Sequence, residues 1–590
     1  MNIVRFLCAL VFAASLCAQT GIFPLKDIRA GMKGVGKTVF SGSRIAEFEV
    51  EVLGVLDNIG PKQALILARL SGGPLAETGV LQGMSGSPVY IGGRLVGAVA
   101  MGFAFSKEPI AGIRPIEDML RVEGTPAITG RAARLRPWDG RLSALVPPRE
   151  DVLAAGERMV DIATPVSFGG FTRETIEHFA PQLRSLGLEP RQGMSGGGRL
   201  DQAMGAPSKL EPGSMISVQL VSGDLSIGAD GTLTYIDGKR IYAFGHRFLS
   251  VGSTDLPFAR SEVLTLLPNL SSSFKISTAR EWMGSITQDR SVAVAGELGR
   301  RAATIPVSIS VVDRGENAAK PASYQLRIVN DRVLSPFLVQ MAVFTAIDAT
   351  ERTTGESSFS VNGEVEFEGG AAPVKLNNMY SGDFGLAAQV SLATAVPVAY
   401  VMQSGFPALR PKRVALNIES YPRKRQLQID ELWSSRREAR PGETIELTVM
   451  LTGESGVELA RKVSYKVPAG APPGQLQFTA ADANVMNITE YRQLVAAPPR
   501  SPAQLVSFMN GLRANTKAYV RVWRTEPAYD VEGETLPNPP PSAGMILART
   551  QPSLAAVPAM LNSKIAELEI AVGADMVVSG SKTIQVEVKE

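Results

Sequence analysis

Alternation of apolar and polar residues recurs along the chain and predicts a protein built mainly from β-strands. Residues 48–53 and 216–220 each alternate with a period of two, as strands with one buried face do. Residues 88–91 and 94–99 are apolar runs separated by two glycines, which is typical of a hairpin with a two-residue turn. Helical patterns are fewer and are expected at four places: 116–120, 172–186, 335–349 and 501–515. The pattern therefore predicts a mainly β fold with minor α.

Changes in this pattern divide the 590 residues into successive segments. Two β-rich stretches stand on either side of an irregular, partly helical one, and a mixed α/β region follows them. Near residue 427, short alternating strands separated by Pro/Gly turns predict an Ig-like β-sandwich, which a small α/β module follows. The expected bounds are 19–124 and 211–330 for the β-rich stretches, 125–210 for the connecting segment, 331–426 for the mixed region, 427–498 for the sandwich and 499–590 for the C-terminal module.

Residues 1–18 have the pattern of a signal peptide. Arg5 is the only charge before an apolar run, small residues follow that run, and cleavage is expected after Ala18. The run is about half the length that crosses a bilayer, and no later stretch reaches the roughly 20 apolar residues needed. We therefore expect an exported protein of the periplasm, the cell envelope or the medium. No integral membrane segment is expected once the signal is removed.

The composition narrows the chemistry. The 60 basic and 57 acidic residues leave a formal charge of +3, and no basic run carries interleaved aromatics, so nucleic acid is not an expected partner. Both cysteines, Cys8 and Cys17, lie in the predicted signal, so the mature chain would have no thiol for a disulfide or a metal. The two histidines, His178 and His246, are too few for a histidine-rich zinc site. We expect no metal and no cofactor, and histidine-dependent catalysis must use one of these two residues.

One motif carries recognisable chemistry: Gly-Met-Ser-Gly-Ser-Pro at residues 83–88. Ser85 lies in a glycine-flanked turn between apolar, strand-like runs, and acyl-transfer enzymes need a hydroxyl that projects from such a turn. Gly83 and Gly86 permit unusual backbone angles. The backbone N–H groups of Gly83 and Ser85 are the expected oxyanion donors if the geometry follows trypsin-like enzymes. Taken without its surroundings, the motif is typical of an ordinary Gly/Ser turn.

The longer string at residues 78–89, with the glycine hairpin after it, resembles the SpoIVB family of serine peptidases (stage IV sporulation protein B). In that family the same Gly-Met-Ser-Gly-Ser-Pro string bears the nucleophile, and a Gly-Lys-Leu-Ile-Gly-Ala-Val-like hairpin follows. His246 ends the string Ala-Phe-Gly-His, which is similar to the Ala-Leu-Gly-His string of the family's catalytic histidine. The resemblance covers about residues 30–120 and 211–300. It implies a trypsin-like two-barrel body that cleaves protein or peptide substrates with Ser85 and His246.

Two features depart from the family. The serine half precedes the histidine half, whereas the family has the reverse order; a two-barrel body tolerates this as a circular permutation, because geometry and not chain order makes a triad. The family's aspartate lies shortly before the serine, and here that place reads Ser-Gly-Gly-Pro-Leu (71–75) without a carboxylate. Asp289 and Asp255 are the candidate substitutes. The alternatives are a Ser–His dyad, a substitute acid or no hydrolysis, and losing the orienting acid of a triad lowers the rate by about 10⁴.

Three functions therefore compete. The leading one is an exported serine endopeptidase with Ser85 as nucleophile and His246 as base. The second is a catalytically weak or inactive peptidase-like scaffold of the cell envelope, which the missing acid favours. The third is a carbohydrate-binding protein, against which the presence of only four tryptophans argues. A second Gly-Met-Ser-Gly around Ser195 lacks the proline and the flanking strands and is expected to be a loop. The sequence specifies neither the substrate nor the oligomeric state.

Overall fold

The structure is a computed structural model. It describes residues 21–103, 106–122, 135, 138–141, 159–192, 200, 203–270, 272–315, 320–350, 355–496, 498–531, 534–549, 559–560, 563–573 and 575–590. The predicted signal peptide and the Gly-Met-Ser-Gly string around Ser195 lie outside these residues. Strands account for 52% and helices for 19% of the structure, which confirms the prediction of a mainly β fold with minor α.

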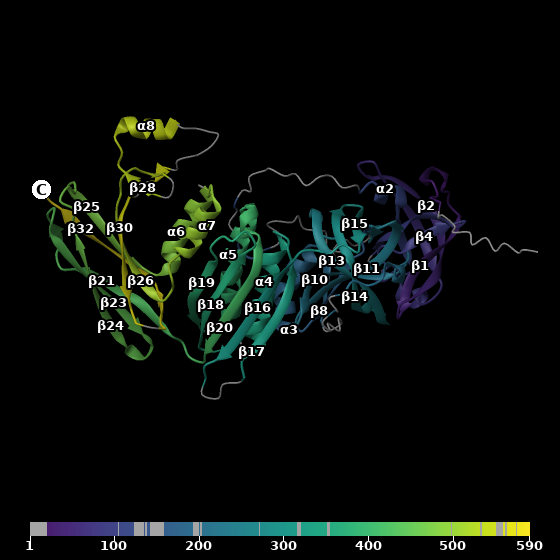
Figure 1. Ribbon diagram of the computed structural model, residues 1–590, viewed down its shortest axis with the longest axis horizontal. Helices are drawn as coiled ribbons and strands as arrows, with labels where there is room; N and C mark the ends of the chain where they lie inside the picture. The colour runs from purple at the N-terminus through teal and green to yellow at the C-terminus, as the bar shows by residue number, and fades with distance from the viewer. Residues whose placement is uncertain are drawn as a thin grey trace, which may run out of the picture.

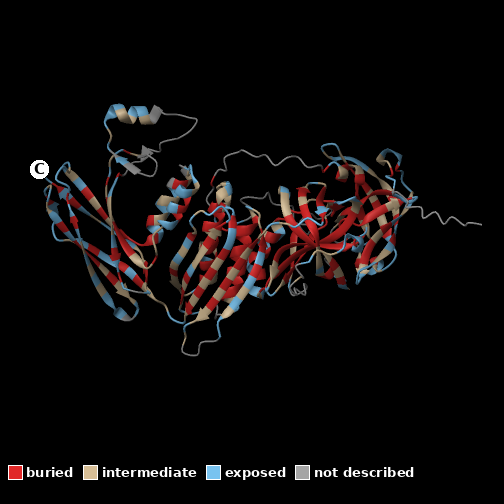
Figure 2. Cartoon of the chain, viewed as in Figure 1, coloured by how far each residue is buried: buried red, intermediate tan, exposed pale blue. Residues whose placement is uncertain are grey.

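The β-built units follow one another along the length of the molecule (Figure 1). The N-terminal unit, drawn in purple, lies at one end, and the C-terminal strands, drawn in green and yellow, lie at the other. Buried residues are densest in the N-terminal and central units, whereas many C-terminal strands alternate between buried and exposed positions (Figure 2). The chain is therefore elongated, with its thickest core in the first two thirds of the sequence.

The first unit is a six-stranded barrel. Its strands are β1 (Lys33–Ser41), β2 (Arg44–Gly60), β3 (Gln63–Ser71), β4 (Pro88–Ile91), β5 (Arg94–Phe103) and β6 (Ile110–Pro115). They pair in the order β4-β1-β2-β3-β6-β5, and β5 pairs again with β4, which closes the ring. β4 and β5 form the predicted glycine hairpin, with Ile91 opposite Arg94. Alternate residues of β2, such as Phe48, Val50 and Val52, fill the interior. Two short helices, α1 (Leu75–Thr78) and α2 (Ile116–Leu120), and the strand β7 (Met159–Asp161) complete this unit.

The second unit is also a closed ring of six strands. They are β10 (Met215–Gly223), β11 (Ser226–Asp237), β12 (Arg240–Ala243), β13 (Gly252–Leu267), β14 (Phe274–Arg290) and β15 (Ala293–Leu298). The order is β10-β13-β14-β15-β12-β11, and β11 pairs again with β10. Two successive rings of this kind are the two-barrel body predicted from the resemblance, with the serine-bearing ring first.

The two barrels touch through backbone hydrogen bonds. Gly42, at the end of β1, exchanges two such bonds with Val263 of β13, at 2.7 and 2.8 Å. Gln82, just before the serine motif, forms an isolated parallel bridge with Phe274 at the start of β14. Because each contact joins residues about 200 positions apart, the barrels are held in a defined register and not merely linked by the chain.

The second barrel continues into a 13-stranded sheet. On one side β11 pairs with β8 (Thr164–Gly169), which pairs with β9 (Leu188–Gln192). On the other side β10 is followed by β17 (Ala322–Val329), β16 (Thr304–Asp313), β20 (Pro411–Tyr421), β18 (Ser357–Phe367) and β19 (Val374–Gly382). The boundaries expected at residues 210 and 330 therefore fall within one continuous sheet, because β8 pairs with β11 and β16 pairs with β20 across them.

Three helices pack on this sheet and on one another: α3 (Arg173–Ser185), α4 (Leu334–Asp348) and α5 (Leu386–Gln403). All but one residue of α4 are buried, as expected of a helix that is apolar on every side. α5 is, among the described helices, long and apolar enough to cross a membrane by length and composition, but 61% of that stretch is buried inside the fold. This burial is typical of a core helix.

The C-terminal unit is a β-sandwich. One sheet has the order β24-β23-β21-β31 and the other β22-β32-β25-β26-β30, and apolar residues of both form one core. The strands are β21 (Gln426–Ser434), β22 (Glu438–Ala439), β23 (Thr444–Gly453), β24 (Glu458–Lys466), β25 (Gly474–Ala481), β26 (Lys517–Arg524), β30 (Ser563–Ala571), β31 (Val577–Ser579) and β32 (Ser581–Val588). The boundary expected at residue 498 passes through this sandwich, since β26 and β32 both pair with β25.

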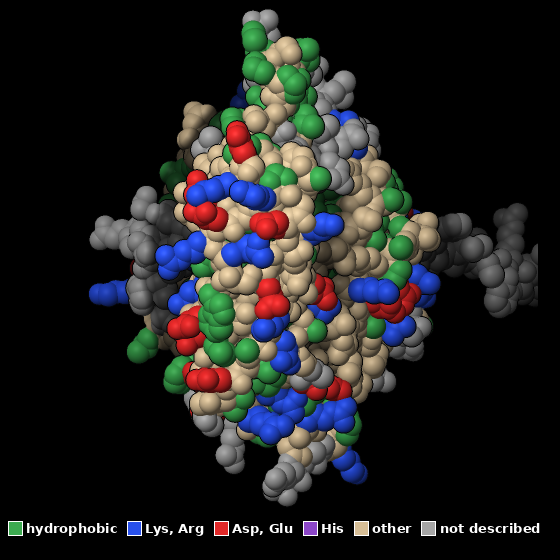
Figure 3. Space-filling model, turned by 90° about the vertical axis from the view of Figure 1, so that its left-hand side faces the viewer, with side chains coloured by type: hydrophobic (Ala, Val, Ile, Leu, Met, Phe, Trp, Pro, Cys, Tyr) green, Lys and Arg blue, Asp and Glu red, His purple; other side chains and the backbone are tan. Residues whose placement is uncertain are grey.

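Smaller elements are inserted in the sequence between the strands of the sandwich. The helices α6 (Ala483–Ala496) and α7 (Pro502–Asn510) stand between β25 and β26 in the sequence. A small sheet of β27 (Ala528–Val531), β28 (Glu534–Pro537) and β29 (Ala559–Met560), with α8 (Pro541–Arg549), projects from it in Figure 1. Seen from this end of the molecule, acidic and basic side chains are interspersed (Figure 3). This face therefore presents no field of a single sign.

Candidate active site

The serine motif forms a tight turn between α1 and β4. Gly83 and Gly86 have φ angles of 90° and 94°, in the left-handed region that favours glycine. Ser85, between them, is fully buried, and its Oγ has no hydrogen-bond partner among the described residues. The turn therefore buries the hydroxyl of Ser85 without a hydrogen bond in this structure.

The backbone N–H groups of this turn are of two kinds. Four of them donate to carbonyl oxygens: Gln82 to Ser273, Met84 to Leu81, Gly86 to Val99 and Ser87 to Met84, over 2.7–3.0 Å. The N–H groups of Gly83 and Ser85 have no acceptor among the described residues. These two are the donors expected from the sequence for an oxyanion, and buried N–H groups are rarely left without an acceptor. The turn thus has the hydrogen-bond pattern of an oxyanion site.

The serine turn is bound to β11 of the second barrel by three hydrogen bonds. The backbone N–H of Thr232 donates to the carbonyl of Ser85 at 2.8 Å, and the Thr232 hydroxyl donates to the carbonyl of Gly83 at 2.8 Å. The hydroxyl of Thr234 donates to the carbonyl of Gly86 at 2.7 Å. The backbone carbonyls of Gly83, Ser85 and Gly86 therefore all accept hydrogen bonds from two threonines that lie almost 150 residues further along the chain.

The histidine segment meets the same part of β11. Phe244, two residues before His246, donates its N–H to the carbonyl of Thr232 at 3.3 Å. A Cβ built on Gly86 would lie 2.0 Å from that carbonyl oxygen and 2.6 Å from the Phe244 nitrogen, so the serine turn and the histidine segment are in close backbone contact. A Cβ on Gly245 would lie 3.2 Å from Ala98 of β5. The structure thus brings the two predicted site segments together across the barrel interface.

His246 is fully buried in the loop after β12. Its Nδ1 lies 2.7 Å from the carbonyl oxygen of Arg247. A carbonyl oxygen only accepts, so Nδ1 carries the proton in the neutral ring and Nε2 is left as the proton acceptor. This is the tautomer that a general base requires.

Asp289, the first candidate acid, lies on β14 and is 1% exposed. Its carboxylate accepts the N–H groups of Phe248 at 2.8 Å, Leu249 at 2.7 Å and Val251 at 3.2 Å. These residues form the loop that begins immediately after His246. Asp289 therefore stabilises the loop that follows His246.

Asp255, the second candidate acid, is engaged elsewhere. It accepts the Ser285 hydroxyl at 2.6 Å and the Ala303 N–H at 2.9 Å, and it pairs with Arg300 at 3.3 Å. These partners place it beside a surface cavity of about 540 Å³ and not in the histidine loop. Its hydrogen bonds are those of a structural carboxylate.

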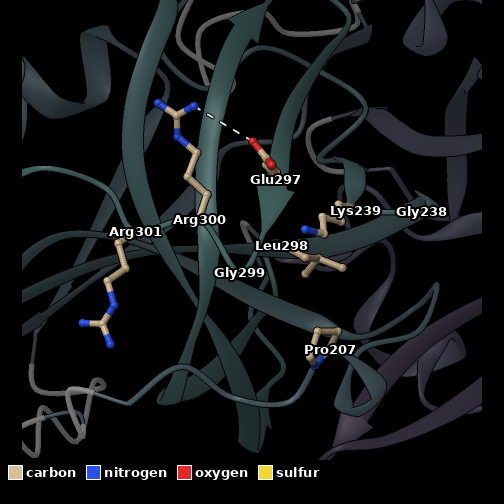
Figure 4. A pocket seen from close by; sticks show the side chains of 8 residues that line it. All are labelled: Pro207, Gly238, Lys239, Glu297, Leu298, Gly299, Arg300 and Arg301. Atoms are coloured by element: carbon tan, nitrogen blue, oxygen red, sulfur yellow. Dashed lines mark ion pairs between the residues drawn. The ribbon is translucent and has the colours of Figure 1, made fainter.

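The charged side chains that line this cavity do not point toward a common centre. It is lined by Pro207, Gly238, Lys239, Glu297, Leu298, Gly299, Arg300 and Arg301. In Figure 4 the guanidinium of Arg300 faces Glu297, with which it pairs at 4.0 Å, while the side chain of Arg301 extends away from Lys239. The basic groups therefore do not converge on one point where an anion could bind.

A second cavity, of about 380 Å³, lies where α3, α4 and the start of α5 meet. His178 lies on its rim, exposed and stacked on Phe344 at a centroid distance of 5.0 Å. Neither cavity includes Ser85 or His246. The candidate active site is therefore closed in this structure.

Reasoning from the sequence missed the polar groups beneath the serine turn. Lys275 and Asp230 are each 2% exposed, and burial lowers the pKa of Lys275 to about 7 and raises that of Asp230 to about 6. The Lys275 ammonium donates to the hydroxyl of Thr38 at 2.7 Å. A lysine in the otherwise small and apolar string Ser-Phe-Lys-Ile-Ser (273–277) is the one signal in the sequence that could have indicated it.

Comparison with known families agrees with this site. Residues 19–120 match the family SpoIVB peptidase S55. The serine-bearing barrel is therefore similar to the SpoIVB peptidase family. The match contains Ser85 and its turn, and it ends before the second barrel and His246. A peptidase family implies protein or peptide substrates. No curated protein and no solved structure matches the chain.

Proposed function

We propose that the chain is an exported serine endopeptidase in which Ser85 is the nucleophile and His246 the base. The observation that carries this proposal is the contact between two segments. The serine turn, in which the N–H groups of Gly83 and Ser85 have no acceptor among the described residues, lies against Thr232 of β11, which also accepts a hydrogen bond from the histidine segment. An ordinary Gly/Ser turn needs neither feature.

The chemistry follows from these groups. His246 Nε2 takes the proton of Ser85 Oγ as the oxygen attacks the peptide carbonyl, and the N–H groups of Gly83 and Ser85 stabilise the oxyanion that forms. The imidazolium then gives the proton to the leaving amine, and the acyl-enzyme forms. His246 Nε2 next takes a proton from a water molecule whose oxygen attacks the acyl carbon. The ester bond to Ser85 Oγ then breaks, and His246 returns the proton to Oγ, so the acid is released and the enzyme regains its starting protonation state.

Access is the condition for this reaction. Ser85 and His246 are fully buried, so a substrate reaches them only after the serine turn and the neighbouring strands separate. We take the described structure as the closed form of the enzyme. The same burial, together with the missing family aspartate, favours the second candidate: a peptidase-like scaffold with little or no activity.

The proposal also includes export. Removal of residues 1–18 by a signal peptidase would leave a mature chain that starts at Gln19, and N-terminal sequencing of the secreted or periplasmic protein tests this directly. A mature protein that retains residues 1–18 would contradict it. The export proposal stands or fails independently of the catalytic one.

A fluorophosphonate probe tests the catalytic proposal on the full mature protein. We expect labelling of the wild type, none of Ser85→Ala, and labelling of His246→Ala slowed by about 10² or more, because the base is lost. Ser87→Ala and His178→Ala are matched controls: Ser87 is a second buried serine of the same turn, and His178 is the other histidine. Both should label normally. A folded wild type that is not labelled would support the scaffold, and labelling that survives Ser85→Ala would contradict the assignment of the nucleophile.

A further inference from the structure

Lys275 is a buried lysine whose side chain runs beneath the serine turn. It is the second residue of β14, and its backbone N–H donates to the carbonyl of Gln82 at 3.2 Å, while Gln82 donates to the carbonyl of Ser273 at 2.9 Å. A Cβ built on Gly83 would lie 3.4 Å from Cδ and 3.6 Å from Cβ of Lys275. The aliphatic arm of Lys275 therefore occupies the space directly beside Gly83, the residue that supplies one of the two free N–H groups.

The ammonium group ends in the other barrel. Nζ donates to Thr38 Oγ1 at 2.7 Å, and Thr38 is a fully buried residue of β1. Because Nζ is two bonds of about 1.5 Å beyond Cδ, it lies within about 6 Å of the same point beside Gly83. One side chain of the histidine-bearing barrel thus passes under the serine turn and is fixed to the serine-bearing barrel.

Asp230 of β11 is the counter-charge of this lysine. It is buried and accepts the hydroxyl of Ser167 at 3.2 Å. Burying such a pair contributes little net stability, since desolvation offsets the attraction between the charges. A buried pair of this kind is better explained by the geometry that it imposes on its neighbours.

We propose that Lys275 is a positioning residue of the oxyanion site, which holds Gly83 between the two barrels so that its N–H keeps the direction that an oxyanion requires. This inference rests on the proposed peptidase function. It adds a part that the serine and histidine motifs do not contain. Since the halves stand in reversed chain order, their relative position must be fixed by contacts of this kind and not by the connecting chain.

Two variants separate the parts of this arrangement. Lys275→Met keeps most of the aliphatic arm and loses the ammonium, and Thr38→Val keeps its shape and loses the acceptor. The double variant Lys275→Met/Asp230→Asn avoids an unpaired buried carboxylate if the single variant does not fold. Arg260→Met is the matched control, because it breaks an ion pair with Glu281 of β14, the strand that also carries Lys275, without touching the serine turn.

Two measurements on the full mature protein test the proposal. Hydrogen exchange of residues 80–88 should speed up in the Lys275 and Thr38 variants, relative to the rest of the barrel, and not in Arg260→Met. Fluorophosphonate labelling per folded molecule should slow by about 10- to 100-fold in the same variants, because a displaced donor stabilises the oxyanion poorly.

The outcomes are distinguishable. Wild-type labelling with unchanged exchange and unchanged labelling in the Lys275 and Thr38 variants would overturn the positioning role and leave the peptidase standing. Exchange that rises equally through the whole barrel would also overturn it, since the pair would then be a structural tie only. If the wild type is never labelled and exchange in the Lys275 and Thr38 variants is faster only at residues 80–88, the positioning role is supported and the peptidase is contradicted.

Discussion

Replacing Asp289 by alanine removes the acceptor of three backbone N–H groups in the loop that follows His246. Two of these bonds are short, at 2.8 and 2.7 Å, and the third is 3.2 Å long. A hydrogen bond to a charged group contributes about 1.5–3 kcal/mol. Counting the two short bonds alone, Asp289→Ala should lower the free energy of unfolding by about 3–6 kcal/mol, a large part of the total that a domain has.

Asp289→Asn distinguishes holding the loop from orienting the histidine. An asparagine keeps one oxygen and turns an NH₂ group toward an N–H, so the loop should lose roughly half as much stability as in the alanine variant. If Asp289 acts only through the loop, labelling by the fluorophosphonate probe should fall in step with that loss. Urea unfolding and hydrogen exchange of residues 247–251 measure the loop, and the labelling rate measures the site.

One result would refute this reasoning. In a triad, the Asp-to-Asn change leaves the structure in place and lowers the rate by about 10⁴. An Asp289→Asn protein with normal exchange at residues 247–251 and a loss of labelling of that size would show that Asp289 is the orienting acid itself. Asp255→Asn is the control, because that carboxylate binds Ser285 and Ala303 outside the histidine loop. It should cost stability without a specific loss of labelling.

Two further predictions concern the barrel interface. Gly86→Ala should destabilise the protein by about 3 kcal/mol or more, from backbone strain at φ 94° and from a Cβ placed 2.0 Å from the Thr232 carbonyl oxygen. Gly31→Ala, with a φ of 82° and nothing near its Cβ, should show only the cost of the strain, and equal losses of stability would contradict the clash. Burial raises the pKa of Asp230 from 3.8 to about 6, so the folded state holds more protons than the unfolded state in that range and stability falls as the pH rises through it. Burial lowers the pKa of Lys275 from 10.5 to about 7, so stability rises again from about pH 7 to 10.5. The difference in unfolding free energy between the wild type and Lys275→Met/Asp230→Asn should therefore have a minimum near pH 6–7. It should rise by about 3 kcal/mol toward acidic pH and by about 5 kcal/mol toward basic pH. A difference that does not change with pH would contradict these pKa shifts.

The local parts of the site could be predicted from the sequence because local rules determine them. A two-residue glycine turn between apolar runs gave the β4–β5 hairpin, and Ile91 faces Arg94 as that turn requires. The glycines of the motif take the positive φ angles that were expected, and the N–H groups without acceptors are those of Gly83 and Ser85. Each of these features depends on residues within a few positions of one another.

The remainder depends on residues that are far apart. Thr232 binds the serine turn across 149 positions, and Lys275 reaches Thr38 across 237. The alternation of apolar and polar residues does not predict such a pair, because a threonine counts as a polar residue of a strand whether it is buried or exposed. The sandwich has the same kind of long-range pairing, because Phe478 of β25 pairs with Ile584 of β32. A boundary placed at residue 498 from the local sequence pattern therefore divides strands that share a sheet.

In the proposed enzyme, other groups take the place of the carboxylate that the SpoIVB peptidase family has before the serine. In a triad that acid does two things: it fixes the tautomer and direction of the imidazole, and it stabilises the imidazolium that forms. Here the carbonyl of Arg247 does the first, at 2.7 Å from Nδ1. Asp289 fixes the N–H groups of the two residues that follow Arg247, so it acts on the imidazole through the loop. A carbonyl dipole stabilises a cation less than a carboxylate does, so the expected enzyme is slow, correctly oriented and dependent on the integrity of one short loop.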